Sequence, residues 1–499
     1  MVRNEDTSFE RQTTSNDSGF YTVTNISPGY YTVTVEAPGF KKSSSTRNKL
    51  DAGLPMAVNM ELTVGQLTEV VNVEANATQI NTESAAVGKT VEQKQIQNLT
   101  LNGRNPLFLA LLKPGVRGGA LSGFSFGLTS GGFAMNGGRS QDSLITFDGA
   151  VGIRTRANGT SIGTADLDTV QEVQILTANY SAEYGRSAAG QIRMVTRSGS
   201  KDFHGSFYEY FRNSKLDANS WARNKAAATN FAAPFRYNQF GYNVSGPVMI
   251  PGVLNKNREK LFFLFAQEWV RFRQDQTTFQ RVPSALMRNG DFSELLGSNV
   301  YYGAPRAIAD PLSTQPCNIL ATAAQPVVGG PGCFTNNVIP ANRQSPNGIA
   351  FLKFYPLPNG SFQGNNNFIQ VRGAPQNQRK DTISVDYNPT QSQVLRFRGA
   401  NYNYDVANAF GGGFDFAPSA LDRPNQTGSL GHTWTLSPTT INDFLFTASV
   451  DRVTIAVQTA GGRYQRSRSG INYPYIFSEP KEIQDKVATF VVPMLSAGS

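Results

Sequence analysis

The chain lacks any hydrophobic run long enough to cross a membrane as a helix. Of its 499 residues 39% are hydrophobic, and the most apolar stretch, Leu261–Trp269, is broken by Gln267 and Glu268. A helical span needs roughly 18 or more consecutive apolar residues, so helical membrane proteins are excluded. A strand that faces lipid on one side needs apolar residues only at alternate positions, so a membrane β-barrel is not excluded.

Histidine is almost absent, which removes most enzyme chemistry. The only histidines are His204 and His432, and no group of acidic, histidine or cysteine residues has the spacing of a metal site. Gly159–Gly163 has the letters of a hydrolase nucleophile turn, but no strand precedes it, so we interpret it as a flexible loop. The sequence therefore predicts neither an enzyme nor a bound cofactor.

Cysteine is equally rare. Cys317 and Cys333 lie in one loop that is rich in Gly and Pro. Their spacing predicts a local disulfide formed in an oxidising compartment, and two unpaired thiols are the alternative.

Clusters of positive charge are missing as well. Lys and Arg total 45 against 36 Asp and Glu, which gives a net charge of +9, yet no basic run exceeds two residues. Nucleic-acid binding requires basic residues gathered on one face, so we predict no nucleic-acid partner. The scattered charge suits loops that face the phosphates of lipopolysaccharide, and it suits an ordinary solvated surface equally well.

The chain is rich in aromatic residues and glycine, and strand-like segments recur along it at regular intervals. It contains 33 Phe, 18 Tyr and 47 Gly. Segments of about ten residues, the length of a strand that crosses a membrane, recur in the last 300 or so residues. The segments are Phe203–Arg212, Arg236–Gly246, Lys260–Val270, Asp381–Asn388, Val394–Asp405, Gln426–Leu436 and Thr440–Thr454.

The connections between these segments alternate between long and short. Asn213–Phe235, Arg271–Lys380 and Val406–Asn425 are long, whereas Pro247–Glu259 and Pro389–Gln393 are short. Tight turns at the periplasmic end and long loops outside are typical of outer-membrane barrels, so the pattern predicts transport or reception across an outer membrane. Seven strands cannot close a barrel in lipid, and Met1–Glu10 has no signal-peptide pattern, so we expect a fragment.

The first 62 residues predict a small β-sandwich. Gly19–Thr24, Tyr30–Glu36 and Pro55–Leu62 have the alternation of strands, and Asn25–Gly29 is a turn with Pro and Gly. Through Asn16–Tyr21 and Pro28–Val33 this part resembles the carboxypeptidase regulatory-like domain, which has a carbohydrate-binding-like fold. Sugar binding does not follow from the fold.

A short strand-like stretch, Leu67–Glu74, follows in a linker. One interpretation is an ordinary edge strand. The other is a strand that a partner binds by β-augmentation, with main-chain hydrogen bonds between the two chains.

Residues 79–200 predict a compact α/β domain. The expected helices are Val91–Leu99 and Asn105–Leu112, and the expected strands are Leu144–Gly149, Val170–Leu176 and Gln191–Thr196. Asp166 and Asp168 are too few for calcium, so we interpret them as helix caps.

Several motifs in this region and beyond it resemble one family. Asn102-Gly103-Arg104, Gly137-Gly138-Arg139, Asp148-Gly149 and Glu183-Tyr184-Gly185-Arg186 resemble the plug of TonB-dependent outer-membrane receptors. Asn238–Gly241, Gly290–Ser293, Asn337–Arg343 and Tyr355–Asn359 strengthen the match to the Oar-like branch. The resemblance implies a mostly β protein with an N-terminal sandwich, an α/β plug and the first strands of a large antiparallel transmembrane β-barrel.

The resemblance also implies a division of the chain into domains. Residues 1–65 are the sandwich, 66–78 a linker with a TonB-box-like strand, 79–200 the plug and 201–499 the partial barrel. The expected partners are TonB, outer-membrane lipid and an unknown extracellular ligand, with the sandwich and plug on the periplasmic side. The candidates for TonB contact are Thr68, Glu69, Val70, Val71 and Val73. The alternative is a non-transporting surface protein, an adhesin or a secretion-linked scaffold.

Two further predictions concern the direction in which side chains of the barrel strands point. Arg396 and Arg398 should face the lumen, where Glu172, Glu183 and Arg186 of the plug are candidate partners. The strand aromatics should form a lipid-facing band and interface girdle. They are Phe207, Tyr208, Tyr210, Phe211, Phe262, Phe263, Phe265 and Trp269.

Overall fold

The computed structural model describes residues 1–457 and 470, apart from several gaps. The gaps are 6–8, 25, 27, 52–54, 66–69, 75–84, 119–131, 155–158, 181–184, 220, 225–231, 233, 251, 324, 363–364, 411–417 and 438–439. The described part is mostly β, which confirms the predicted fold class, and none of its helices is long and apolar enough to span a membrane.

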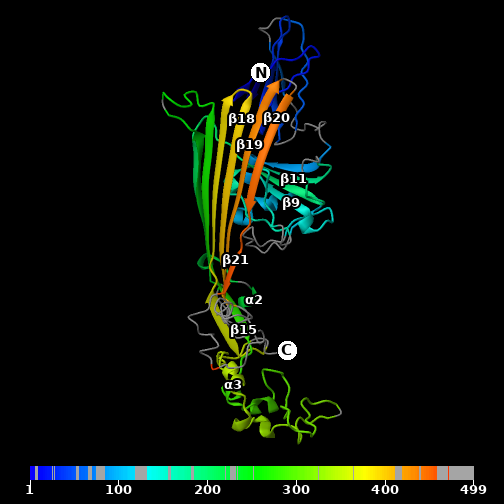
Figure 1. Cartoon of the computed structure of the whole chain (residues 1–499), viewed down its shortest axis with the longest axis vertical. Coiled ribbons are helices and arrows are strands. Elements are labelled where there is room, and N and C mark those ends of the chain that lie inside the picture. Colours follow the sequence, from blue (N-terminus) through cyan, green and yellow to red (C-terminus); the bar gives the residue numbers. More distant parts are fainter. Residues whose placement is uncertain are drawn as a thin grey trace, which may run out of the picture.

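Long antiparallel strands form a curved sheet, which we call the wall (Figure 1). In spatial order its strands are β13 (His204–Asn213), β14 (Phe235–Pro247), β15 (Leu261–Gln280), β17 (Gln376–Thr390), β18 (Gln393–Asn408), β19 (Ser419–Ser437) and β20 (Thr440–Val450). Every predicted barrel strand is present, and β13 and β20 are the two open edges of the described sheet.

The wall strands are longer than predicted at the end that carries the long connections. β15 continues to Gln280, and its extension pairs with β16 (Phe368–Gly373), while β21 (Thr454–Val457) pairs with β19. The apolar alternation of β15 fades after Val270, but backbone pairing does not require apolar side chains. The extension carries a lobe, residues 281–367, beyond the end of the wall (Figure 1).

Short helices and a disulfide organise the loops. The first long connection holds η5 (Ser214–Leu216) and α2 (Trp221–Asn224). The lobe holds η7 (Met287–Asn289), η8 (Ser293–Leu296), η9 (Thr335–Asn337), η10 (Ala341–Arg343) and α3 (Pro346–Leu352). Cys317 and Cys333 are disulfide-bonded within the lobe, as predicted.

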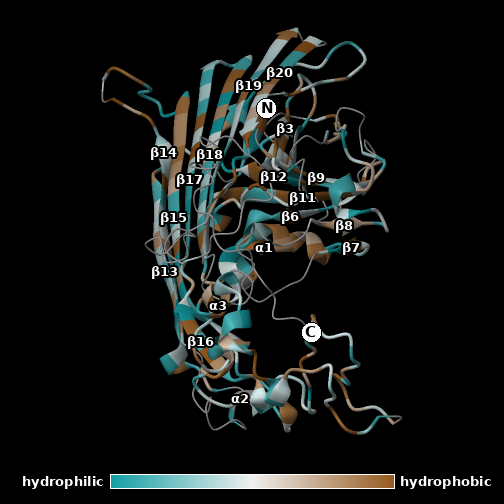
Figure 2. Ribbon diagram, turned by 60° about the horizontal axis from the view of Figure 1, so that its bottom comes forward, coloured by the Kyte–Doolittle hydropathy of each residue, from teal (hydrophilic) through white to brown (hydrophobic). Residues whose placement is uncertain are grey.

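A second sheet, in the region predicted as the plug, lies on the concave side of the wall (Figure 2). Its order is β10 (Ala150–Val151), β9 (Ser143–Phe147), β12 (Gly190–Thr196), β11 (Val170–Ala178) and β6 (Val87–Glu92). Buried Val91, Ile145, Ile175 and Ile192 belong to its core. We call residues 79–200 the plug region.

The remaining elements of the plug region pack around this sheet. They are α1 (Gln93–Asn98), η1 (Asn102–Arg104), η2 (Pro106–Leu112), β7 (Val116–Arg117), β8 (Ala134–Met135), η3 (Ser140–Asp142) and η4 (Leu167–Thr169). The predicted helix Val91–Leu99 begins late, because Val91 and Glu92 complete β6 against β11. Pro106 and the capping side chain of Asn105 start η2 where expected.

The N-terminal part forms a sheet in the order β2 (Glu10–Arg11), β1 (Val2–Asn4), β3 (Gly29–Val35), β4 (Lys42–Leu50) and β5 (Val70–Glu74). Of the strands predicted for the sandwich, Tyr30–Glu36 is found as β3, and the strand-like stretch Leu67–Glu74 contributes β5. Gly19–Thr24 and Pro55–Leu62 do not form strands, because β1 and β4 already occupy both edges of β3. Tyr21, Val23, Val58 and Met60 from these segments still pack against the sheet as a second layer.

Candidate functional site between the plug region and the wall

The side chains of the wall strands separate by face. On β15, Phe262, Leu264 and Glu268 point inward and are buried, whereas Phe263, Phe265 and Trp269 alternate with them on the outer face. On β13, Phe207 and Phe211 are exposed, whereas Tyr208 and Tyr210 reach inward to Arg104. The prediction of a lipid-facing role was therefore wrong for Tyr208, Tyr210 and Phe262, because the sequence shows alternation but not which face is inside.

Arg104 is one of the residues through which the plug region contacts the wall. It belongs to the turn η1, where Gly103 and Arg104 both have positive φ angles, of 69° and 50°. Glycine adopts this backbone region freely, whereas for arginine it is uncommon. The turn lies directly before η2, so the guanidinium is fixed close to the core of the plug region.

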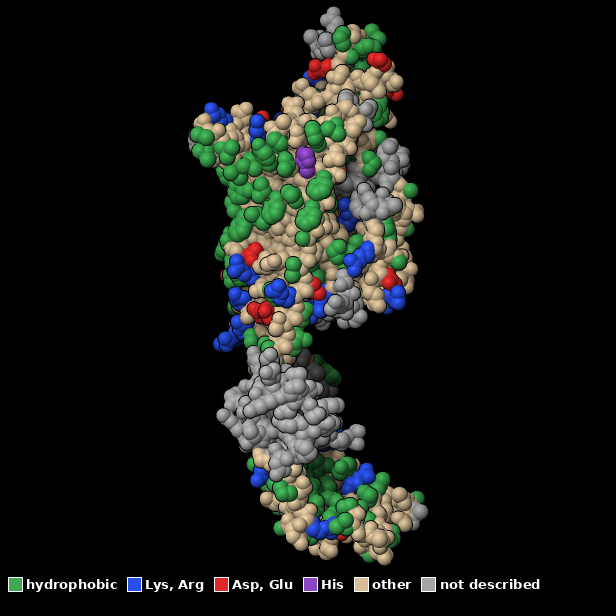
Figure 3. Space-filling view, viewed as in Figure 1, with side chains coloured by type: hydrophobic (Ala, Val, Ile, Leu, Met, Phe, Trp, Pro, Cys, Tyr) green, Lys and Arg blue, Asp and Glu red, His purple; other side chains and the backbone are tan. Residues whose placement is uncertain are grey.

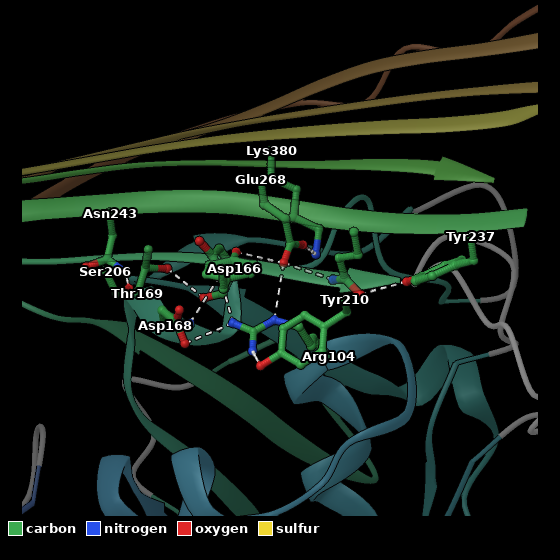
Figure 4. Close-up of polar contacts among 12 residues, drawn as sticks. Arg104, Asp166, Asp168, Thr169, Ser206, Tyr210, Tyr237, Asn243, Glu268 and Lys380 are labelled. Atoms are coloured by element: carbon green, nitrogen blue, oxygen red, sulfur yellow. Dashed lines mark hydrogen bonds and ion pairs between the residues drawn. The ribbon is translucent and has the colours of Figure 1, made fainter. Parts of the chain in front are cut away.

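Arg104 contacts charged and aromatic groups from both parts of the molecule (Figure 4). Its Nη2 lies 2.9 Å from Asp168 Oδ1 on the plug side, and its Nε lies 3.4 Å from Glu268 Oε2 on the wall. Its Nη1 donates to the hydroxyl of Tyr210 at 2.9 Å, and the guanidinium lies 4.2 Å from the ring centroid of Tyr208. These contacts join η1 and η4 to β13 and β15.

Glu268 is the centre of the wall side of this cluster. It is fully buried and accepts a 2.6 Å hydrogen bond from Lys380 Nζ on β17. Tyr208 and Gln239 also donate to its Oε2, each at 2.9 Å. A buried carboxylate is tolerated only when its oxygens are satisfied, and two cations with two neutral donors meet that demand here.

The acidic side of the cluster comes from η4. Asp166 caps η4 by accepting from the Asp168 amide at 3.1 Å, which confirms the capping interpretation, and it also accepts from the Tyr208 hydroxyl at 3.2 Å. Burial, with Glu268 and Asp168 nearby, raises the pKa of Asp166 to about 7. Burial opposes the charge of Arg104, but the carboxylates of Asp168 and Glu268 outweigh it and raise the pKa of Arg104 above its ordinary value.

A second contact lies beside this cluster, at Gly159–Gly163. Asn425 Nδ2 of β19 donates to the Ile162 carbonyl at 2.7 Å, and a Cβ at Gly163 would lie 2.2 Å from the ring of Tyr402. The Tyr402 ring also packs 5.3 Å from that of Phe147. The Ser161 side chain is buried and bonds to the Gly152 and Gly163 carbonyls, so this segment is a docking point for the wall rather than a reactive turn.

The predicted lumen arginines lie at the opposite end of the wall from the lobe, near a cavity of about 1770 Å³ between the N-terminal sheet, the plug region and the wall. Arg398 pairs with Asp386 at 2.9 Å and donates to Ser198 Oγ at 3.2 Å, while Arg396 donates to Thr433 at 3.3 Å. Arg186, which could pair with lumen-facing polar residues, is exposed on the plug region.

The other predicted partners of the lumen arginines are Glu172 and Glu183. Glu172 accepts from Gln174 at 2.6 Å within the plug region. Glu183 lies outside the described residues.

The plug motifs mostly build turns. Gly137 has a positive φ angle, Gly138 packs against Ala189, and exposed Arg139 pairs with Asp142 at 3.0 Å. Asp148 and Gly149 form the tight turn of the β9–β10 hairpin, and the Asp148 carboxylate accepts from the Thr196 amide at 2.8 Å.

The last plug motif is only partly described. Asn102 opens the turn η1, and Gly185 lies on the surface beside Arg186. Tyr184, like Glu183, lies outside the described residues.

The candidate TonB strand is partly described. Val70, Val71 and Val73 belong to β5, which pairs in parallel with β4 at the edge of the N-terminal sheet. Thr68 and Glu69 lie outside the described residues. The structure thus places this strand at the edge of the N-terminal sheet.

Sequence reasoning missed most of the ionic cluster. The sequence placed Arg104 in a plug motif but predicted no contact for it. No relation was predicted among Glu268, Lys380, Tyr208 and Tyr210. One signal was available: Glu268 interrupts the most apolar stretch of a predicted membrane strand, and a charged residue in such a place is usually functional. The arrangement binds two parts of the chain together, and among the described residues no group of His, Cys, Asp and Glu side chains is placed to hold a metal ion.

Comparison with known proteins agrees with this architecture. Residues 195–497 match the model of the outer membrane beta barrel domain, residues 81–191 that of the TonB-dependent receptor plug domain, and residues 1–63 that of the carboxypeptidase regulatory-like domain. A wall with a plug domain on its inner face defines the class of plugged outer-membrane barrels. Because the barrel match covers more than half of the chain, the chain belongs to this outer-membrane barrel family, and it also carries a match to the plug domain of TonB-dependent receptors.

Individual relatives share part of the chain. The TonB-dependent transporter Oar of Myxococcus xanthus is 28% identical over 280 residues, which cover 54% of this chain and 25% of that protein. This chain thus spans about a quarter of the curated relative's length. The outer membrane transporter YddB from Escherichia coli has 8% identity and a TM-score of 0.41, covering 70% of this chain and 37% of that chain. The siderophore receptor PirA from Acinetobacter baumannii has 11% identity and a TM-score of 0.34, covering 74% and 44%.

Proposed function

We propose that this chain is the N-terminal domain, plug and first barrel strands of a TonB-dependent receptor that takes up or senses an extracellular ligand. The observation that carries the proposal is the Arg104–Glu268–Lys380 cluster, which fastens the plug region to the inner face of the wall. A plug held in this way blocks passage until a force moves it.

The proposed division is residues 1–65 for the N-terminal domain, 66–78 for the linker, 79–200 for the plug and 201–499 for the barrel part. The short turns and the N-terminal sheet lie at one end of the wall and the lobe at the other (Figure 1). Long loops of outer-membrane barrels face outside, so the N-terminal sheet and the plug face the periplasm. The class of ligand is not assigned, because the ligand specificity of variable surface loops cannot be derived from their sequence.

The energy for plug movement would come from TonB through β5. The outer edge of β5 has no partner strand among the described residues, and Val71 is exposed. An open edge strand can accept a partner strand through main-chain hydrogen bonds. We infer that the stretch 68–74 is the TonB contact, and that TonB pulls on the plug from there.

The test is binding of the periplasmic domain of TonB to the full-length protein. Deleting residues 68–74, or the single change Val71→Pro, should weaken binding by at least about tenfold, since Pro removes a main-chain donor. Val71→Thr keeps both the donor and the strand preference and is the matched control. Equal TonB binding by the deletion variant and the unchanged protein would contradict the assignment.

The lobe favours a second candidate, a non-transporting surface protein. It is cross-linked by Cys317–Cys333 and carries exposed apolar residues such as Leu312 and Val327. Adhesion would require neither TonB nor plug movement. A protein that binds a surface partner equally well in cells with and without TonB, and that never binds TonB itself, would support this candidate instead.

A further inference from the structure

Two side chains of the N-terminal sheet hold one carboxylate of the plug region. Tyr30 on β3 donates its hydroxyl to Glu92 Oε2 at 2.9 Å, and Lys49 Nζ on β4 lies 2.7 Å from Glu92 Oε1. Both carboxylate oxygens are therefore bound by the N-terminal sheet. We call Tyr30, Lys49 and Glu92 the Glu92 grip.

The Glu92 grip is charged at neutral pH. Burial opposes the ionisation of Glu92, but the hydrogen bonds from Lys49 and Tyr30 outweigh it and hold the pKa of Glu92 below its ordinary value. Burial also opposes the charge of Lys49, but Glu92 and Asp51, which lies 2.9 Å from Lys49 Nζ, outweigh it and raise the pKa of Lys49. Hydrogen bonds between charged groups are roughly twice as strong as those between neutral groups, so this contact is the stronger kind.

Glu92 is the last residue of the first strand of the plug region. That strand, β6, lies at the edge of the plug sheet and pairs with β11 alone among the described residues. The end of β6 nearest the linker is exposed at Val87, Gly88 and Lys89. An edge strand with one neighbour and an exposed end opens more easily than the centre of a sheet, so any further contact on β6 matters for its retention.

The same N-terminal sheet contains the strand that we propose as the TonB contact. β5 pairs in parallel with Lys42–Thr46 of β4, and Lys49 lies three residues further along β4. Along the chain, β5 ends at Glu74 and β6 begins at Val87. Through space, β4 joins the two strands directly, since it is hydrogen-bonded to β5 and holds Glu92. A pull on β5 therefore acts on the Glu92 grip through β4.

The contact between the N-terminal sheet and the plug region lies beside open space. Tyr30, Lys49 and Glu92 all line the cavity of about 1770 Å³ between the N-terminal sheet, the plug region and the wall. In Figure 3 the N-terminal part projects from the end of the wall opposite the lobe. A projecting domain beside a cavity can move without disturbing a packed core, so a few polar contacts decide its position.

We propose that the N-terminal sheet is a latch that holds the first plug strand in place until TonB pulls the sheet away. With the Glu92 grip closed, β6 is held by β11 and by the N-terminal sheet. Opening the grip leaves β6 with β11 alone, and the plug then opens from this edge. The trigger rests on the proposed TonB contact in β5, whereas the latch itself acts without TonB.

Hydrogen–deuterium exchange of the purified full-length protein in detergent measures the latch without TonB. The double variant Tyr30→Phe, Lys49→Gln removes both contacts to Glu92 and nearly keeps the side-chain volumes. The amides of β6 should exchange about tenfold faster than in the unchanged protein, because hydrogen bonds to a charged group are lost. The amides of β9 and β12, which lie further from this edge of the sheet, should keep their rates.

Two further variants separate a latch from a general loosening of the fold. Lys42→Gln breaks an ion pair of 2.6 Å with Glu36 inside the N-terminal part, and it should leave the exchange of β6 unchanged. Glu92→Gln alters only the plug side of the contact. It keeps an acceptor for Tyr30 but loses the charge that attracts Lys49, so the exchange of β6 should be intermediate.

A second measurement tests the trigger. The periplasmic domain of TonB, bound to the full-length protein in lipid, serves as the handle for single-molecule pulling. β6 should leave the plug at a lower force in the double variant than in the unchanged protein. If TonB does not bind, the proposed TonB contact is wrong, while the exchange rates still decide whether the latch exists.

Three results would overturn the latch. One is equal exchange of β6 in the double variant and the unchanged protein. Another is an equal acceleration in Lys42→Gln, which would mean that only the general stability of the N-terminal sheet matters. The third is faster exchange throughout β9 and β12, which would show that the Glu92 grip supports the whole plug rather than its first strand.

Discussion

The inner face of the wall carries buried charged side chains and the outer face carries exposed aromatic ones, although the same strands make both. Inward-facing Glu268, Lys380 and Ser384 are buried, whereas outward-facing Phe397 and Phe444 are 44% and 54% exposed. A water-soluble sheet has the reverse arrangement, with apolar residues inside. The difference agrees with the outer-membrane barrel family, in which the outer face meets lipid and the inner face here holds the plug region.

The two faces also differ in how they are stabilised. The outer face needs only apolar side chains, each of which contributes independently. The inner face needs partners for every buried charge, so Arg104, Glu268 and Lys380 depend on one another. Substitutions on the inner face should therefore have the larger effects, and those on the outer face should depend on depth in the membrane.

Removal of Glu268 should have the largest effect. Glu268→Ala leaves Lys380 and part of Arg104 without a counter-charge in a buried place, which costs about 3–5 kcal/mol. The expected result is a plug that unfolds or leaves the barrel at lower denaturant concentration, measured by protease accessibility of the plug in the full-length protein. Glu209→Ala on the exposed outer side of β13 is the control and should change little. Equal plug retention in both variants would remove the distinction between the faces.

Charge on the outer face should have the next largest effect. Phe397→Arg puts a cation on the lipid-facing side of β18 and should destabilise the barrel by about 2–4 kcal/mol if it lies near the bilayer midplane. Val371→Arg lies on β16, which pairs with the extension of β15 after Val270. This change should destabilise the barrel much less. Unfolding of both variants in lipid vesicles measures the difference. Equal costs would show that this face of β18 is not in lipid.

The last expected effect is on how plug stability changes with pH rather than on its value at one pH. The pKa of Asp166 is raised to about 7 in the folded protein, whereas an ordinary Asp titrates near 4. Between these two values the folded state binds more protons than the unfolded state, so the contribution of Asp166 to stability falls as pH rises from about 4 to 7. Asp166→Asn should flatten plug stability across this window.

The control for this prediction is Asp142→Asn. Arg139 holds the pKa of Asp142 below its ordinary value, so its replacement should leave the fall between pH 4 and 7 in place. Unfolding of the plug followed by protease accessibility at several pH values separates the variants. A slope that is unchanged by Asp166→Asn would contradict the role given to Asp166.

The sequence predicted the wall well because its strands obey one local rule. Alternation over about ten residues and the order of long and short connections located the seven main strands of the wall without any tertiary knowledge, whereas β16 lies in a connection that was expected to be a loop. The local disulfide Cys317–Cys333 was predicted for the same reason, since its partners are close in sequence. The extension of β15 was missed because its residues after Val270 no longer alternate in polarity.

The cluster at the plug was not predicted because it is non-local. Arg104 and Glu268 are 164 residues apart, and which face of β15 is inside depends on the plug. In the N-terminal part the strand pattern of Gly19–Thr24 was misleading, since pairing also needs a free neighbouring edge. Local patterns thus identified the strands, whereas the site depends on how separate parts of the chain pack.

The most direct test of the account is a disulfide between the plug and the inner face of the wall. Gly163→Cys and Tyr402→Cys should place two thiols within bonding distance, because a Cβ at residue 163 lies 2.2 Å from the Tyr402 ring. In the full-length protein in its membrane, mass spectrometry of non-reduced peptides should find residue 163 linked to residue 402, alongside the natural Cys317–Cys333 pair. A sample in which Cys317–Cys333 forms but residues 163 and 402 stay free would show that the plug does not occupy this wall.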